Sequence, residues 1–161
     1  MTSNDNAQCK IQGCIGKWLL SALLVFIFIA VAEYLIHAVW LKPLYQQTAS
    51  LWRSEEEIKQ LCPLMLGYEA ILAIIVTKLY RKSQKATVAV GEGECAPCPV
   101  KRAVCFGMII GLLFGVMHAA TYIWMPIPAE LAIKWLIAGV LEGLGIGVIL
   151  SFSCGKKAAT K

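Results

Sequence analysis

The sequence of 161 residues predicts an all-α polytopic membrane protein, with four transmembrane helices and a short outer interfacial helix. Hydrophobic residues make up 58% of the chain and charged residues only 16%. The apolar residues gather in four stretches. Each is close to or longer than the roughly 20 residues that a helix needs to cross about 30 Å of hydrocarbon. We expect one membrane domain over residues 1–161, with transmembrane helices at 18–41, 61–80, 103–125 and 131–153.

The first apolar stretch has some features of a signal peptide. Lys10 and Lys17 precede it, and Ala30-Val31-Ala32 resembles a cleavage site. The apolar run continues through Trp40, however, which is too long for the hydrophobic region of a signal peptide. We therefore expect a retained helix that ends or bends at Pro43.

The outer loop, residues 42–60, contains a helix start signal. Ser54 stands three residues before Glu57, as in a capping box, and the acidic Glu55 and Glu56 lie between them. This pattern predicts a short amphipathic helix on the outer membrane surface, running towards the second transmembrane helix. A solvated linker is the alternative, because isolated short helices are marginally stable.

The two remaining connections differ in length. The inner loop, residues 81–102, contains Gly91, Gly93 and Pro97, which break regular structure. The connection at 126–128 is very short, so the third and fourth helices must be antiparallel neighbours.

The basic residues predict the orientation of the chain. Cytoplasmic segments of membrane proteins are enriched in lysine and arginine. Lys42, Arg53, Lys59 and Lys134 alone lie on the opposite side, so both termini are expected in the cytoplasm. The residues on the predicted cytoplasmic side make up eleven of the fifteen basic residues: Lys10, Lys17, Lys78, Arg81, Lys82, Lys85, Lys101, Arg102, Lys156, Lys157 and Lys161.

Glycines repeat every four residues on the third and fourth helices. This spacing puts them on one helix face, where small residues allow two backbones to approach closely in a membrane. We expect these faces to pack against each other, although membrane helices are also rich in glycine in general. The predicted packing glycines are Gly107, Gly111, Gly115, Gly139, Gly143 and Gly147.

Five ionisable residues fall inside the apolar stretches: Glu33, His37, Glu69, His118 and Glu142. Charge within a bilayer is costly, so such residues usually face the protein interior and often mark a functional site. Glu33 and His37 are four residues apart and share a helix face. At 1.5 Å per residue, Glu33 and Glu69 both lie roughly 12 Å from the outer ends of their helices. A shared polar cluster in the outer leaflet is expected, with Glu142 deeper.

Three interpretations of this cluster remain open. The side chains can tie the helices together by hydrogen bonds. They can form a proton or substrate path, as chains of glutamate and histidine do in membranes. They can also hold a metal ion through His37, His118, Glu33 and Glu69, because imidazoles and carboxylates suit zinc, copper or iron. A haem held by the two histidines is a special case of the third interpretation.

The cysteines suggest a second candidate site on the cytoplasmic side. Cys9 and Cys14 form one spaced pair and Cys95 and Cys98 another. Two such pairs can supply four thiolates to zinc or an iron–sulfur cluster. A redox pair at Cys95 and Cys98, or free thiols in a reducing compartment, are the alternatives.

Several short motifs of the membrane part resemble a set of small bacterial four-helix membrane proteins of uncharacterised function. The resemblance implies the four-helix fold but does not imply any activity. The cysteine-rich inner segments are not part of it. The motifs are Glu33-Tyr34-Leu35-Ile36-His37, Pro43-Leu44-Tyr45, Leu51-Trp52-Arg53, Pro126-Ile127-Pro128, Leu131-Ala132, Trp135, Gly139 and Glu142.

The sequence favours a non-catalytic protein. It has no phosphate-binding glycine loop, no recognisable serine–histidine–acid arrangement and no basic stripe with interleaved aromatic residues for nucleic acid. We expect an accessory or structural subunit of a larger membrane complex in the bacterial cytoplasmic membrane. Its partners would be lipid and either that complex or further copies of the chain. The alternative is a small proton- or metal-coupled transporter or metal-binding membrane protein that uses the Glu/His cluster, and its cofactor would be a metal ion.

Overall fold

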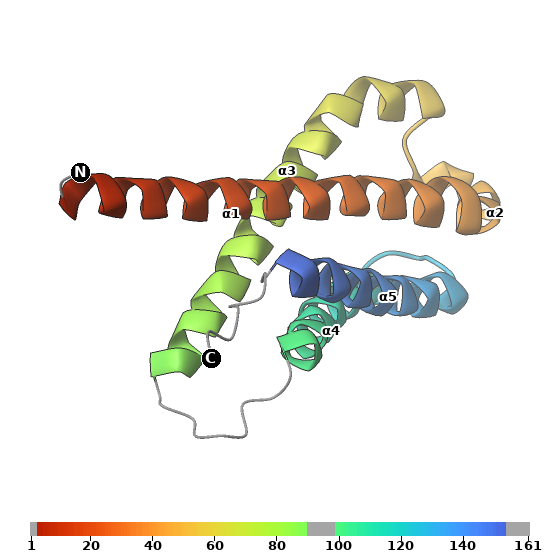
Figure 1. The fold of residues 1–161 in the computed structure, drawn as a ribbon. Coiled ribbons are helices and arrows are strands. Elements are labelled where there is room, and N and C mark those ends of the chain that lie inside the picture. Colours follow the sequence, from red (N-terminus) through yellow and green to blue (C-terminus); the bar gives the residue numbers. More distant parts are fainter. Residues whose placement is uncertain (1–2, 90–98, 154–161) are drawn as a thin grey trace.

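The computed structural model describes residues 3–89 and 99–153, with side chains described over 15–84 and 100–152. The prediction of an all-helical chain is confirmed, and these residues contain no strand. The described residues form five α-helices and three short segments of other helix types. Figure 1 shows how they are arranged. Their bounds are α1 Ser3–Glu33, the π-helix η1 Tyr34–Trp40, α2 Lys42–Gln47, the 3-10 helix η2 Ala49–Leu51, α3 Glu55–Ala89, α4 Pro99–Ala119, the 3-10 helix η3 Ala120–Ile123, and α5 Ala129–Ser153.

Four segments within the described ranges are long and apolar enough to cross a membrane. They are Ile15–Trp40, Glu55–Gln84, Val100–Ile123 and Ala129–Phe152. Many of their large apolar side chains are exposed, among them Ile109 and Phe152. Soluble monomers rarely expose apolar surface on this scale, so length and exposure together suggest membrane insertion.

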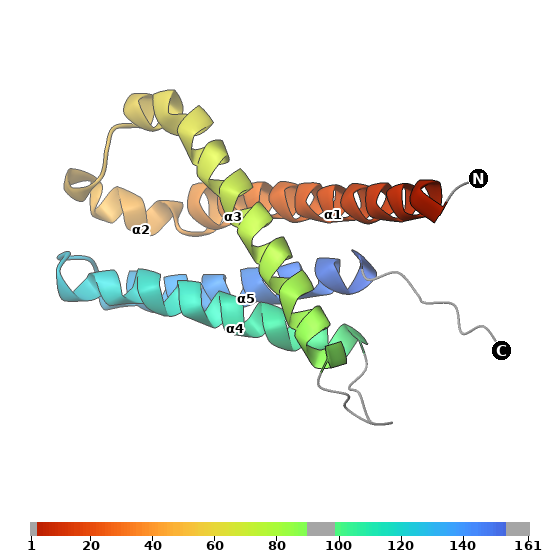
Figure 2. The same ribbon diagram turned by 90° about the vertical axis from the view of Figure 1, so that its left-hand side faces the viewer.

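The start of α3 has the predicted capping box. The Ser54 backbone N–H donates to Glu57 Oε2 at 3.0 Å, and the Glu57 N–H donates to Ser54 Oγ at 3.3 Å. The helix that follows is not a separate surface element, because α3 runs through Pro63 to Ala89. The short helix of the outer loop is instead α2. Figure 2 shows that the first turns of α3 bend away from its long axis. Pro63 lies inside this helix, and it lacks the backbone N–H of a regular helical turn.

The closest packing in the fold lies between α4 and α5, which run side by side as a hairpin (Figure 2). The predicted glycines of both helices meet at this contact. A Cβ atom added to Gly111 would lie 2.8 Å from Gly143 Cα, and one added to Gly139 would lie 2.7 Å from Gly115 Cα. One added to Gly107 would lie 2.7 Å from Gly147 Cα. Backbone therefore rests directly on backbone, an arrangement that only glycine permits.

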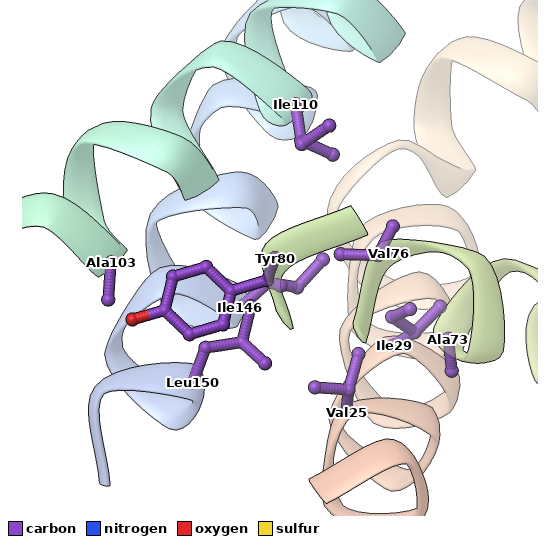
Figure 3. Packing of buried hydrophobic residues seen from close by; sticks show 9 residues of the cluster. All are labelled: Val25, Ile29, Ala73, Val76, Tyr80, Ala103, Ile110, Ile146 and Leu150. Carbon is purple, nitrogen blue, oxygen red and sulfur yellow. The ribbon is translucent and has the colours of Figure 1, made fainter. Parts of the chain in front are cut away.

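The other two long helices pack on this hairpin. Side chains of α1, α3, α4 and α5 form one buried cluster, which Figure 3 shows: Val25, Ile29, Ala73, Val76, Tyr80, Ala103, Ile110, Ile146 and Leu150. Gly145 of α5 leaves room for the Phe28 ring of α1. Figure 1 shows that α3 crosses α1 at a steep angle. The outer half of α3 consequently diverges from the bundle.

The α4–α5 contact predicts the effect of adding one methyl group. In Gly143→Ala the new Cβ would lie 2.5 Å from Gly111 Cα, so the helices must separate. We expect a loss of about 1–3 kcal/mol in the free energy of unfolding, as for other overpacked sites. Thermal unfolding in one detergent, followed by circular dichroism, measures it.

Gly67→Ala is the matched control, because a Cβ there would meet no atom within 4 Å. Its stability should be unchanged or higher, since alanine is the better helix former. Equal destabilisation by both variants would contradict the described contact.

Candidate functional site

A chain of hydrogen bonds connects α5, α2 and the outer end of the first membrane-crossing segment. Trp135 Nε1 lies 2.9 Å from the Tyr45 hydroxyl oxygen, which lies 2.6 Å from His37 Nδ1. His37 Nε2 lies 3.0 Å from Glu33 Oε2. Four residues of four elements, α5, α2, η1 and α1, are therefore joined in series, and two of them are the predicted pair of Glu33 and His37.

The direction of the first bond is fixed. The indole N–H of Trp135 can only donate, so the Tyr45 oxygen accepts from it. The bond between Tyr45 and His37 follows the tautomer of His37: the Tyr45 O–H donates to Nδ1 when that nitrogen carries no proton, and the Tyr45 oxygen accepts when it does. A neutral imidazole that accepts at Nδ1 carries its proton on Nε2, where it donates to Glu33.

The state of Tyr45 agrees with this direction. Burial raises the pKa of the Tyr45 phenol to about 12, aided by the nearby Glu33 charge and opposed by the hydrogen bond from Trp135. The hydroxyl therefore keeps its proton at all physiological pH values and stays available as a donor.

Local sequence explains how Tyr45 reaches His37. The π-helix η1 closes with a bond from the Leu41 N–H to the Ile36 carbonyl at 2.8 Å, five residues back. Pro43 then stands at the start of α2, where its missing N–H costs little. The chain turns there, and Tyr45 folds back over the end of η1.

Aromatic rings hold this region together. The Tyr45 and His37 rings are nearly parallel, with centroids 5.8 Å apart. The Trp52 ring stands edge-on to two others, with its centroid 5.2 Å from that of Tyr45 and 6.2 Å from that of Trp135. Trp52 Nε1 also donates to Thr48 Oγ1 at 2.8 Å. Tyr45 and Trp52 pack against a second buried cluster, formed by Leu41, Leu44, Ile127, Leu131, Ala132 and Trp135.

The predicted residue His118 lies at the edge of this cluster. Its side chain is exposed, and its ring centroid lies 6.2 Å from that of Trp135. It thus touches the aromatic cluster without entering the hydrogen-bond chain described above.

The other two predicted acids are placed in the helix bundle without such partners. Glu69 of α3 is only 7% exposed, and Glu142 of α5 is half-buried. Both carboxyl oxygens of Glu69 and Oε1 of Glu142 are buried without a hydrogen-bond partner among the residues that the structure describes.

The predicted metal site at His37, His118, Glu33 and Glu69 is not assembled. Within the described ranges, no three histidine, cysteine, aspartate or glutamate side chains are placed to hold one metal ion. A further reason lies in His37 itself, because Tyr45 and Glu33 occupy both of its ring nitrogens. This also leaves no free nitrogen for haem.

The predicted thiol site lies beyond what the structure describes. Cys95 and Cys98 fall outside the described residues, as do the side chains of Cys9 and Cys14.

Sequence reasoning missed Tyr45, Trp52 and Trp135 as members of the site. Tryptophan is common at membrane interfaces, so its presence in the sequence does not indicate a role in a site. One signal was present, since Tyr45 follows His37 by eight residues across the turn at Pro43. The contact with Trp135 spans 90 residues and has no local signal.

Comparisons with protein-family models, curated proteins and solved structures give no match for this chain. The fold and the site therefore stand on their own geometry. That geometry joins Trp135, Tyr45, His37 and Glu33 in one series of polar contacts.

Tyr45→Phe tests the direction of the hydrogen-bond chain. The variant keeps the ring but removes the acceptor for Trp135 and the donor to His37. We expect the ¹⁵N signals of His37 to lose the pattern of a single Nε2–H tautomer. The free energy of unfolding should fall by about 1–3 kcal/mol, the net worth of two hydrogen bonds.

The matched control is Tyr34→Phe, at a tyrosine whose side chain is exposed on η1. It should leave both the His37 signals and the stability unchanged. An unaltered His37 spectrum in Tyr45→Phe would show that Tyr45 does not set the tautomer.

Proposed function

We propose that this chain is an integral protein of the bacterial cytoplasmic membrane, acting as a non-catalytic accessory or structural subunit of a larger membrane complex. Both termini are cytoplasmic in this proposal, and lipid and the partner helices surround the bundle. The observation that carries the proposal is the first part of α3, residues 55–68, which leaves the bundle and exposes every side chain except that of the half-buried Cys62.

The outer arm, defined here as residues 55–68, is the part of α3 concerned. It diverges from α1, α4 and α5 (Figure 2). Every one of its side chains is exposed except that of Cys62, which is half-buried. Leu64 is 52% and Tyr68 64% exposed. Long membrane helices usually pack along most of their length, so this arm is suited to a partner outside the chain.

Gly67 gives the outer arm a packing notch. A Cβ there would meet no atom within 4 Å, whereas the glycines of α4 and α5 are filled by neighbouring backbone or, at Gly145, by a ring. Small residues in membrane helices favour close approach of another helix. An unfilled notch on an unpacked helix supports docking of a partner helix at this position.

The arrangement of the ends supports the proposed orientation. The first turns of α1 and the last turns of α5 lie at the same end of the molecule, opposite α2 (Figure 2). Lys78 lies over the Trp18 ring at 5.4 Å near that end, and Lys134 over Trp40 at 6.0 Å near the other. Pairs of lysine and tryptophan are suited to the two membrane interfaces.

A second candidate function is a small proton- or metal-coupled transporter. The hydrogen-bond chain ending at Glu33 and the unpartnered acids Glu69 and Glu142 favour the proton-coupled form over the metal-coupled one. Loss of a transport phenotype in Glu69→Gln, with normal assembly, would favour this function over the accessory role.

Gly67→Leu tests the accessory role. In native membranes solubilised with mild detergent, the wild-type chain should migrate with larger partners, far above its own 17.6 kDa. Leucine fills the notch, so the variant should be released from them. Native gel electrophoresis with mass spectrometry of the bands measures both results.

Val116→Phe is the control, because it adds bulk to an exposed position of α4 away from the outer arm. Its migration should match that of the wild type. Migration of the wild-type chain as a free monomer or homodimer would contradict the proposal.

A further inference from the structure

The two ends of the described bundle differ in charge. At the end that contains α2, four basic side chains are matched by four acidic ones: Lys42, Arg53, Lys59 and Lys134 against Glu55, Glu56, Glu57 and Glu130. The opposite end carries six basic side chains, and no acidic residue occurs in the segments that hold them, 15–32, 70–84 and 100–129. We call it the basic end, and its six side chains are Lys17, Lys78, Arg81, Lys82, Lys101 and Arg102.

The acids that the structure does not describe are too few to balance this charge. The side chains of three acidic residues, Asp5, Glu92 and Glu94, fall outside the described ranges. Even if all three lay nearby, the six bases of the basic end would outnumber them. The basic end therefore keeps a positive net charge.

Contacts along α3 bring basic side chains of three helices into one region. Lys78 Nζ lies 5.4 Å from the centroid of the Trp18 ring of α1. Six residues further along α3, Gln84 Oε1 accepts a hydrogen bond from Arg102 Nη1 of α4 at 3.2 Å. The two contacts are thus roughly 9 Å apart along the helix axis. Between them Tyr80 is buried in the cluster that all four long helices share (Figure 3).

The basic end offers more hydrogen-bond donors than the described residues accept. Trp18 Nε1 and Gln84 Nε2 are buried without an acceptor among those residues, although buried donors normally have one. Four lysines also form no ion pair with any acid that the structure describes: Lys17, Lys78, Lys82 and Lys101. These donors and charges suit a negatively charged ligand that is rich in acceptor oxygens.

The position of the basic end favours a lipid over a soluble anion. Lys17 and Lys101 are the third and second residues of the candidate spans that begin at 15 and 100, and Gln84 is the last residue of its span. Bases at the ends of membrane spans lie at the level of the lipid headgroups. Apolar side chains continue from there into the spans, with exposures of 53%, 48% and 46% for Leu19, Ile75 and Leu79.

We propose that the basic end binds the headgroup of an anionic phospholipid, whose acyl chains lie along the exposed apolar side chains of α1 and α3. A juxtamembrane cluster of about four to eight basic residues is the pattern that attracts such headgroups. Arg102 supplies a planar guanidinium, which suits phosphate oxygens, and the lysines supply point charges. The inference uses the membrane location in the proposed function and does not depend on the accessory role.

Lipid retention by the full chain tests the site. The protein is reconstituted in vesicles of equal parts phosphatidylglycerol and phosphatidylcholine, extracted with mild detergent, and its retained lipid is quantified by mass spectrometry. We expect several-fold more phosphatidylglycerol than phosphatidylcholine. Added salt should reduce this excess, because screening weakens the attraction. Equal retention of the two lipids would overturn the proposal.

Lys82→Gln combined with Lys101→Gln removes two charges from the basic end. Both side chains are exposed and take part in no ion pair or cation–π contact of the described residues, so the helix content should be unchanged. The phosphatidylglycerol excess should fall by roughly fivefold for each lysine removed.

Lys42→Gln combined with Lys59→Gln is the matched control, because it removes two exposed lysines from the opposite end. Its lipid retention should match that of the wild type. An equal loss in both double variants would show that overall charge, rather than the basic end, retains the lipid, and would overturn the proposal.

Soluble glycerol phosphate distinguishes a lipid from a free phosphate. Added during extraction at matched ionic strength, it should leave the phosphatidylglycerol excess unchanged, because it lacks the acyl chains. Displacement of the lipid by it would contradict a lipid site. All these measurements use the purified chain and none depends on migration in native membranes, so the two proposals fail separately.

Discussion

The backbone contact between α4 and α5 is the interaction on which the rest of the fold depends. Glycines of the two helices interleave so closely that an added Cβ at Gly107, Gly111 or Gly143 would overlap the neighbouring backbone. In a bilayer, apolar side chains gain little by leaving lipid, so close packing of this kind is a main source of helix association. The hairpin forms the frame, and Phe28 of α1 packs into the space left by Gly145.

The outer site depends on that frame. Trp135 and Glu142 both lie on α5, so the hairpin sets the positions of both the hydrogen-bond chain and one buried acid. From Trp135 the chain passes through Tyr45 to His37, which orders α2 and the end of η1 together. Buried polar groups need such partners. Glu33 has such a partner in His37, whereas Glu69 has none among the described residues.

Length and apolar composition predict the four long helices well, since they reflect the thickness of a membrane. The glycine spacing also gives the two faces that meet, because four residues return to one side of a helix. The steep crossing of α3 and its continuity through Pro63 have no such local signal. Tyr45 and Trp135 could not be paired from sequence, because their contact joins residues 90 positions apart and depends on how α2 folds over α5.

Solid-state NMR of glycine-labelled protein in lipid bilayers tests the central claim most directly. The account predicts cross-peaks between α4 and α5, for example from Gly111 to Gly143 and from Gly115 to Gly139. It predicts none between helices for Gly16 and Gly67, where an added Cβ would meet no atom within 4 Å. Absence of the α4–α5 cross-peaks, with both helices still formed, would contradict a fold framed by backbone contact.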